Sequence, residues 1–147
     1  MESGHGGRVW NDSLLCQAVA PQASYRQRVA YELKEDIPLI PTPLVKGNRL
    51  YFWTDDGTVS CLRLDSGKLV WKERVGGAYY ASPVGVNRSI YNVAKNGHVV
   101  VLAAADKFEV LGRMSLGEMS YATPAVAGGV MYLRTRSQLF SLGGTGK

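Results

Sequence analysis

The sequence is poor in the residues that catalytic and metal sites are built from. Among 147 residues it has two cysteines, Cys16 and Cys61, and two histidines, His5 and His98. Two cysteines make no disulfide framework, and we interpret both as small, buried apolar residues. No spacing matches a zinc site, and two isolated histidines give no basis for a Ser–His–Asp or Cys–His arrangement. We therefore predict no catalytic, cofactor-binding or metal-binding residues.

The chain also lacks an apolar run of the roughly 18–20 residues that a membrane-spanning helix needs. Residues 1–7 are polar and glycine-rich, without the cationic start and apolar centre of a secretory signal, so we expect a disordered leader. The net charge is +5 and the basic residues are spread along the chain. This spread is typical of solvated surfaces, and we predict no membrane span and no nucleic-acid partner. The sequence does not indicate the cellular compartment of the protein.

Glycine, by contrast, is abundant, with 17 residues, and several glycines separate short apolar runs. From Thr42 to Trp71, four runs of aliphatic, aromatic or β-branched residues alternate with glycine-containing turns at 46–48, 55–57 and 65–67. Short runs of this kind joined by tight turns predict a four-stranded antiparallel meander. We see no helix of any length.

The same unit recurs with a period of about 40 residues. Pro43, Pro83 and Pro124 lie 40 and 41 positions apart, and each follows a serine or threonine. A tyrosine comes eight positions after each of these prolines, at Tyr51, Tyr91 and Tyr132. A repeat of this length that is built from strands is typical of propeller blades.

We therefore predict an all-β fold, a partial β-propeller of four-stranded antiparallel blades. The chain holds about four blades, with three, four, four and three strands, and the first strand is expected at Arg8–Trp10. The predicted divisions are a leader at 1–7, an incomplete blade at 8–40, complete blades at 41–80 and 81–121, an incomplete C-terminal blade at 122–144 and a tail at 145–147.

One segment connects the repeat with a known family. Ser66–Trp71 matches the Thr/Ser-Gly-x-x-x-Trp end of the tryptophan-docking repeat. On this segment the chain resembles the pyrroloquinoline-quinone-like β-propeller family, over residues 8–143. The departures are Cys61 and Arg63, where the family usually has alanine and aspartate, and the next copy, where Phe108 and Gly112 replace the glycine and the tryptophan.

The resemblance has consequences for architecture. The run 132–140 looks like the C-terminal blade of long bacterial members of the family. Members have six to eight blades, and their last blade is usually completed by a strand from the N-terminal end. Four blades would leave apolar faces and strand edges in water, which favours pairing with another chain. We expect either self-association with a second copy or missing blades from a longer chain. Family members are often extracytoplasmic.

The resemblance also raises the question of catalysis. Enzymes of the family are quinone-dependent dehydrogenases that hold the quinone over a calcium ion, and some stack it on adjacent cysteines. This chain has no adjacent cysteines. Its acidic residues fall in predicted turns, where aspartate most often makes local backbone hydrogen bonds; they include Asp55, Asp56, Asp65 and Asp106. We predict no cofactor. The absence of adjacent cysteines and the position of the aspartates in turns favour a protein without enzymatic activity, but they do not decide the question.

The leading hypothesis is a propeller scaffold that binds a protein partner through loops on one rim, with Asp55, Lys95 and Arg136 as loop residues to examine. The alternative is a C-terminal fragment of a quinone-dependent dehydrogenase whose ligands lie elsewhere. A third hypothesis is a carbohydrate-binding propeller that uses exposed aromatic residues. The aromatic candidates are expected to pack between blades and at strand ends instead; they are Trp53, Trp71, Tyr79 and Tyr80.

Overall fold

The computed structural model describes residues 14–18 and 28–143, and β-strands are the only regular secondary structure in these ranges. The predicted leader at 1–7, the predicted first strand at Arg8–Trp10 and the tail at 145–147 lie outside the described residues. Within the described ranges no helix is long and apolar enough to span a bilayer.

The described residues form thirteen strands in four antiparallel sheets. The strands are β1 (Leu14–Ala18), β2 (Arg28–Leu33), β3 (Leu44–Lys46), β4 (Arg49–Trp53), β5 (Thr58–Arg63), β6 (Leu69–Arg74), β7 (Val84–Val86), β8 (Ser89–Val93), β9 (His98–Ala103), β10 (Val110–Ser115), β11 (Ala125–Ala127), β12 (Val130–Arg134) and β13 (Leu139–Gly143). We name the sheets the first blade (β1–β2), the second (β3–β6), the third (β7–β10) and the fourth (β11–β13).

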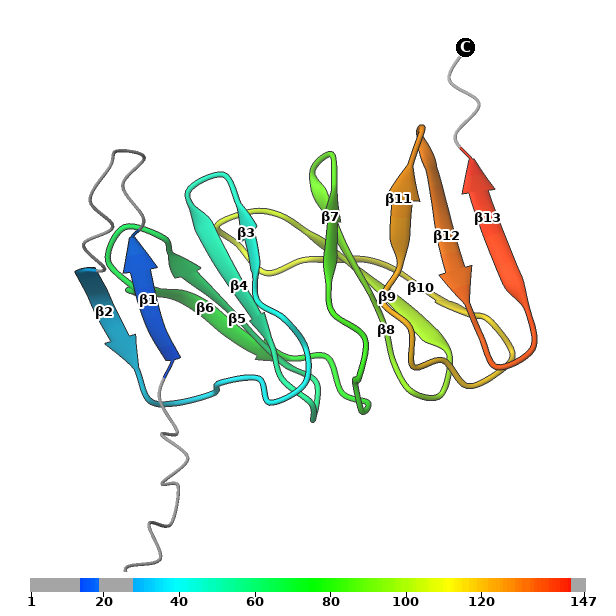
Figure 1. The fold of residues 1–147 in the computed structure, drawn as a ribbon, viewed down its shortest axis with the longest axis horizontal. Helices are drawn as coiled ribbons and strands as arrows, with labels where there is room; N and C mark the ends of the chain where they lie inside the picture. Colours follow the sequence, from blue (N-terminus) through cyan, green and yellow to red (C-terminus); the bar gives the residue numbers. More distant parts are fainter. Residues whose placement is uncertain (1–13, 19–27, 144–147) are drawn as a thin grey trace, which may run out of the picture.

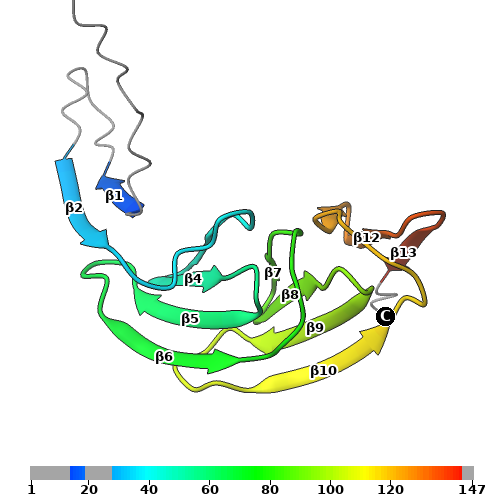
Figure 2. The same cartoon turned by 90° about the horizontal axis from the view of Figure 1, so that it is seen from below.

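The blades stand side by side along an arc (Figures 1 and 2). Within each sheet, strands that are consecutive in sequence are neighbours, so each blade is a simple meander. The short strands β3, β7 and β11 lie on the inner side of the arc, and β6 and β10 lie on its outer side (Figure 2). The predicted all-β partial propeller is confirmed. The predicted residue boundaries between blades stay a prediction.

The blades are held together by apolar side chains between neighbouring sheets. Tyr51 and Trp53 of the second blade pack against Ile90 and Leu102 of the third. Strand β9 contributes to clusters on both of its faces, and its residues 99–102 are all buried. An unbroken apolar run of this kind is typical of a strand that is covered on both faces.

A repeated aromatic residue on the outer strand docks the first blade onto the second and the second onto the third. The Tyr31 hydroxyl donates to the carbonyl of Leu64 at 3.0 Å, and Nε1 of Trp71 donates to the carbonyl of Ala105 at 2.9 Å. Both donors and both acceptors are one repeat apart, at 40 and 41 positions. In the third blade Gly112 takes the tryptophan position, so this contact to the fourth blade is lost.

The hydroxyl residue before each repeat proline also has a structural role. The backbone N–H of Thr42 donates to Oγ of Ser82 at 2.8 Å, and the N–H of Ser82 donates to Oγ1 of Thr123 at 2.9 Å. Each hydroxyl therefore accepts a bond from the preceding blade. The serine or threonine at this repeat position is explained by a chain of hydrogen bonds along the inner side of the arc.

Gly97 lies in the β8–β9 turn, where the backbone of the connection after β10 passes close to it. Its φ is +83°, and a Cβ there would lie 1.8 Å from the carbonyl oxygen of Glu118. Gly76 has a similar φ of +74°, yet a Cβ there would meet nothing within 4 Å. An alanine at Gly76 would therefore be strained only by its backbone conformation, whereas an alanine at Gly97 would also collide with the backbone.

The Glu118 carboxylate fixes the β12–β13 turn. It accepts from the Ser137 hydroxyl at 2.6 Å, the Thr135 hydroxyl at 2.8 Å and the Ser137 N–H at 3.1 Å. These hydrogen bonds lower the pKa of the Glu118 carboxyl from its usual value, and the bond from the Ser137 side chain has the largest effect. The carboxylate thus holds the turn from the neighbouring connection.

We expect Gly76→Ala to lower the free energy of unfolding by about 1 kcal/mol, because an alanine at positive φ is strained. Gly97→Ala should cost more, about 3 kcal/mol or above, because the strain is joined by a backbone collision. Thermal unfolding would show the difference, at about 2–4 °C per kcal/mol for a chain of this size. Equal losses in the two variants would contradict the close approach at Gly97.

We expect Glu118→Gln to lower the melting temperature at about pH 7 and to have a smaller effect at about pH 3. A carboxyl whose pKa is lower in the folded state stabilises the fold above its unfolded pKa, and this contribution is lost as the pH falls through the folded pKa. Melting curves of both proteins across this range test the sign. Glu109→Gln is the control, since no partner of the Glu109 carboxylate is present in the described part of the chain. A pH-independent difference would count against this role.

Candidate functional site

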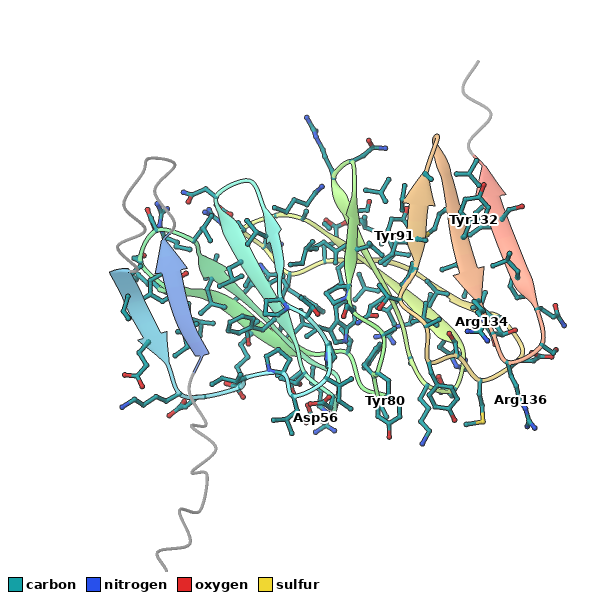
Figure 3. The ribbon with its side chains drawn as sticks, viewed as in Figure 1. Asp56, Tyr80, Tyr91, Tyr132, Arg134 and Arg136 are labelled. Carbon is teal, nitrogen blue, oxygen red and sulfur yellow. The ribbon has the colours of Figure 1, made fainter. Side chains whose placement is uncertain are left out.

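One edge of the arc gathers the longer connections between blades; we call it the rim (lower edge in Figure 1). It consists of the connections 34–43, 75–83 and 116–124 together with the turns 54–57, 94–97 and 135–138. Asp56, Tyr80 and Arg136 mark this edge in Figure 3. Several large apolar and aromatic side chains on the rim are exposed to solvent.

Three of these side chains form an apolar row, made of Ile40, Tyr80 and Tyr121. They are 53%, 40% and 49% exposed. Each lies three positions before a repeat proline, so successive blades present a large side chain at the same place. Sequence reasoning missed Ile40 and Tyr121, although the repeat spacing that singled out the prolines could have found them.

A second row, the charged row, consists of Asp55, Lys95 and Arg136 at the tips of the turns. The backbone places them equivalently, because Tyr79 N–H donates to the Asp55 carbonyl at 2.9 Å and Ser120 N–H donates to the Lys95 carbonyl at 3.1 Å. The structure therefore brings the three predicted loop residues to one edge, at one repeat position.

The two rows contact each other within the third and fourth blades. The rings of Tyr80 and Tyr121 stack with their centroids 5.7 Å apart and an angle of 27° between planes. The Lys95 ammonium lies 5.2 Å from the first ring centroid and 5.9 Å from the second. Both distances are within cation–π range. In the second blade, the carboxylate of Asp55 instead accepts from the N–H groups of Leu39 and Ile40, at 3.0 Å each.

A cavity of about 280 Å³ lies at the end of the rim, next to the stacked rings. Its lining is Tyr121, Ala122, Arg134, Thr135 and Arg136. Arg134 ends β12 and Arg136 lies in the turn that follows (Figure 3). Neither arginine has a carboxylate within ion-pair distance in the described residues.

The predicted turn aspartates are satisfied in different ways. Asp56 makes local bonds, and the Thr54 hydroxyl lowers its pKa from the usual value. Hydrogen bonding from Arg63 lowers the pKa of Asp65 to about 2. Asp106 pairs with Arg49 of the second blade at 2.5 Å. Asp56 has the local role that the sequence predicted, because Thr58 N–H donates to its carboxylate at 3.3 Å, whereas Asp65 and Asp106 mainly bind arginines. In the ranges that the structure describes, no group of three or more His, Cys, Asp or Glu side chains is placed to hold a metal ion.

The four aromatic candidates divide into two groups. Trp53 and Tyr79 are buried with their rings 5.1 Å apart, and burial raises the pKa of Tyr79 to about 12. Trp71 packs against Phe108 at 5.3 Å. These three pack between blades as expected, but for Tyr80 the expectation was wrong, because its ring stays exposed on the rim.

The remaining candidates do not line the rim cavity or lie outside the described residues. Cys61 is fully buried, as predicted, and burial raises the pKa of its thiol. His98 is exposed and lines a separate cavity with Asn96 and Arg113. His5 lies outside the described residues, and the side chain of Cys16 is likewise not described.

Comparison with solved structures shows the fold. The crystal structure of BamB from Moraxella catarrhalis is 21% identical, with a TM-score of 0.63 over 77% of this chain and 36% of that chain. A europium-containing methanol dehydrogenase is 18% identical, with a TM-score of 0.52 over 62% of this chain and 19% of that chain. The chain thus spans about a third of the first structure and a fifth of the second.

A search of curated proteins gave no match. A family model described as outer membrane protein assembly factor BamB matches residues 2–142. This match covers nearly the whole chain and agrees with the pyrroloquinoline-quinone-like repeat seen in the sequence and with the propeller blades of the structure. The chain therefore belongs to the family of the outer membrane protein assembly factor BamB.

Proposed function

We propose that the protein is a non-enzymatic propeller scaffold that binds a protein partner through its rim. The observation that carries the proposal is the apolar row, in which three successive blades present a large, exposed side chain at one repeat position. Exposed apolar groups that line up on a rigid frame are typical of interaction sites.

The backbone that carries the apolar row is held by hydrogen bonds between the turns and the connections of the rim. Each turn tip is bonded to a connection of the rim, as Lys95 N–H donates to the Ala78 carbonyl at 2.7 Å and Arg136 N–H donates to the Met119 carbonyl at 2.9 Å. Rigid positioning lowers the conformational entropy lost when a partner binds. The rim is therefore suited to recognition.

Membership of the BamB family supports a partner that is itself a protein, since the family description names an assembly factor. The methanol dehydrogenase shares the fold at 18% identity. That likeness keeps a quinone-dependent dehydrogenase as the competing function, because one fold can carry either role.

We expect a photo-crosslinking amino acid at position 80 or 121, in cells that express the protein, to give a discrete adduct with a partner protein. Position 88 is the control, because Arg88 is exposed in the β7–β8 turn on the opposite edge. The partner would be identified by mass spectrometry and purified. Tyr80→Ala combined with Tyr121→Ala should then weaken its binding by at least about tenfold, since buried aromatic anchors dominate interface energies.

Two results would contradict the scaffold proposal. One is adducts that form equally well from position 88, which would place binding away from the rim. The other is dehydrogenase turnover by the purified chain with added quinone and calcium, which would favour the competing function. Neither result depends on knowing the partner in advance.

We also propose that a further blade covers the open face of the fourth blade. Tyr132 and Leu139 are 37% and 69% exposed there, whereas Tyr51, two repeats earlier, is 1% exposed under the next blade (Figure 3 shows Tyr132). A second copy is the covering partner that can be tested directly. Light scattering should then give about twice the chain mass of 16.0 kDa. A mass of one chain would instead favour blades supplied by a longer protein.

A further inference from the structure

We propose that the cavity between the second and third blades binds the side-chain carboxylate of an acidic residue of a protein partner. The groups that would donate hydrogen bonds to this carboxylate are the side chains of Asn96, His98 and Arg113. The inference rests on the proposed scaffold function and deepens it, because it names the chemical group by which the rim recognises its partner.

The cavity has a volume of about 230 Å³ and lies where the rim connection 75–83 passes the third blade. The connection forms one wall, and the β8–β9 turn with strands β9 and β10 forms the other. Its lining includes Val75, Gly77, Tyr79, Asn96, His98 and Arg113. Described blades lie on both sides of it (Figure 1), so all of its walls belong to the described chain.

The cavity has cationic and amide side chains but no carboxylate among its lining residues. The Arg113 guanidinium donates to the Val75 carbonyl at 3.1 Å, and it takes part in none of the five ion pairs of the described residues. Oδ1 of Asn96 accepts from the backbone N–H of His98 at 3.2 Å, which leaves the Asn96 NH₂ group as a donor. A carboxylate is the group that such donors bind most strongly.

The equivalent place at the next blade boundary is filled by a carboxylate of the chain itself. Glu118 lies six positions before the repeat proline Pro124, and its carboxylate accepts hydrogen bonds from the turn 135–138, the shortest at 2.6 Å. The residue six positions before Pro83 is Gly77, which has no side chain. The boundary between the second and third blades therefore has the turn but lacks the carboxylate.

The donors at the two boundaries correspond as well. The His98 carbonyl closes its turn by accepting from the Ala94 N–H at 2.8 Å. In the next blade the Gln138 carbonyl accepts from the Thr135 N–H at 2.9 Å in the same way. Nε2 of Gln138 lies 3.5 Å from the Glu118 carboxylate. His98 thus stands where the next blade has a side chain that faces a carboxylate.

The third blade also carries an asparagine where the second has an aspartate. Asp56 and Asn96 each precede a turn glycine and lie 40 positions apart. The Oδ1 atom of each accepts from the backbone N–H two positions later, at 3.3 Å in the second blade and 3.2 Å in the third. The turn requires only this oxygen, so the fold accepts either residue. The asparagine keeps negative charge out of the cavity and leaves it to an external carboxylate.

The place of the cavity favours a carboxylate from a protein over a free organic acid. The connection that lines the cavity also carries Tyr80 of the apolar row, three positions after Gly77. A protein that packs on this exposed ring has its neighbouring side chains beside the cavity, and interfaces commonly combine an apolar centre with polar contacts around it. A free acid gains only the charged hydrogen bonds, which salt weakens.

The test is a selection of displayed random peptides on the full chain, with counter-selection on the variant Asn96→Asp. This variant keeps the oxygen that the turn requires and adds a carboxylate at the cavity, so it should reject an acidic side chain. We expect the enriched peptides to share an aspartate or glutamate next to an apolar or aromatic residue. Enrichment without this acidic residue, or no enrichment, would overturn the inference, while adducts from positions 80 and 121 would leave the scaffold function standing.

The affinity of the most enriched peptide is then measured by fluorescence anisotropy. Asn96→Asp should bind it at least about tenfold more weakly, with an unchanged melting temperature. The matched control is Asn87→Asp, which makes the same change in the exposed β7–β8 turn on the opposite edge and should leave the affinity unchanged. Equal losses in both variants would reveal a general effect of charge and overturn the specific site.

A pair of substitutions at position 98 tests the donor assignment. His98→Gln introduces the residue that approaches the Glu118 carboxylate at the next boundary, so it should keep most of the affinity for the peptide. His98→Leu removes the donor and should weaken binding by at least about threefold. Equal affinities of the two variants would contradict a hydrogen bond from this position.

Two ligand controls identify the source of the carboxylate. A peptide in which the shared acidic residue is replaced by its amide should bind at least about tenfold more weakly. If it binds as well as the acidic peptide, the inference is wrong. Glutarate at about 1 mM should leave the peptide bound. Complete displacement by glutarate would mean that the cavity takes a free acid, and the assignment to a protein partner would then be wrong.

Discussion

The fold depends on the packing of one blade against the next. A four-stranded sheet with two apolar faces cannot bury both of them alone, so each blade is stable only beside its neighbours. Tyr51 and Trp53 reach across one such boundary, and Met131 and Leu133 across the next. The docking aromatics and the hydroxyl chain add directed bonds at the outer and inner ends of the same interfaces.

The rim follows from this packing. The bonds that hold one blade to the next use backbone atoms of the turn tips, such as the carbonyls of Asp55 and Lys95. Since the backbone makes the structural contact, the side chain at each tip is free to differ between blades. The repeat therefore fixes the positions of the rim residues and leaves their chemistry to recognition, which agrees with function residing in sites carried by a common fold.

Charge is divided unevenly along this edge. The carboxylates of Asp55, Asp56 and Glu118 are used internally to fix connections and turns. The cations Arg134 and Arg136 have no such use in the described part of the chain. These carboxylates keep their negative charge, so what differs along the rim is which charged groups have hydrogen-bond partners within the chain. Composition alone does not show this, because it does not say which charged side chains have partners in the folded chain.

The sequence by itself determined the repeat, the strands and the turns, because side-chain alternation and glycine at positive φ are local constraints. It also determined which residues stand at equivalent places in successive blades, such as Asp55 and Lys95. Only the tertiary structure decided that Tyr80 is exposed while Tyr79, its neighbour in sequence, is buried. Burial is a property of what lies next to a residue in space, and no local pattern encodes that neighbour.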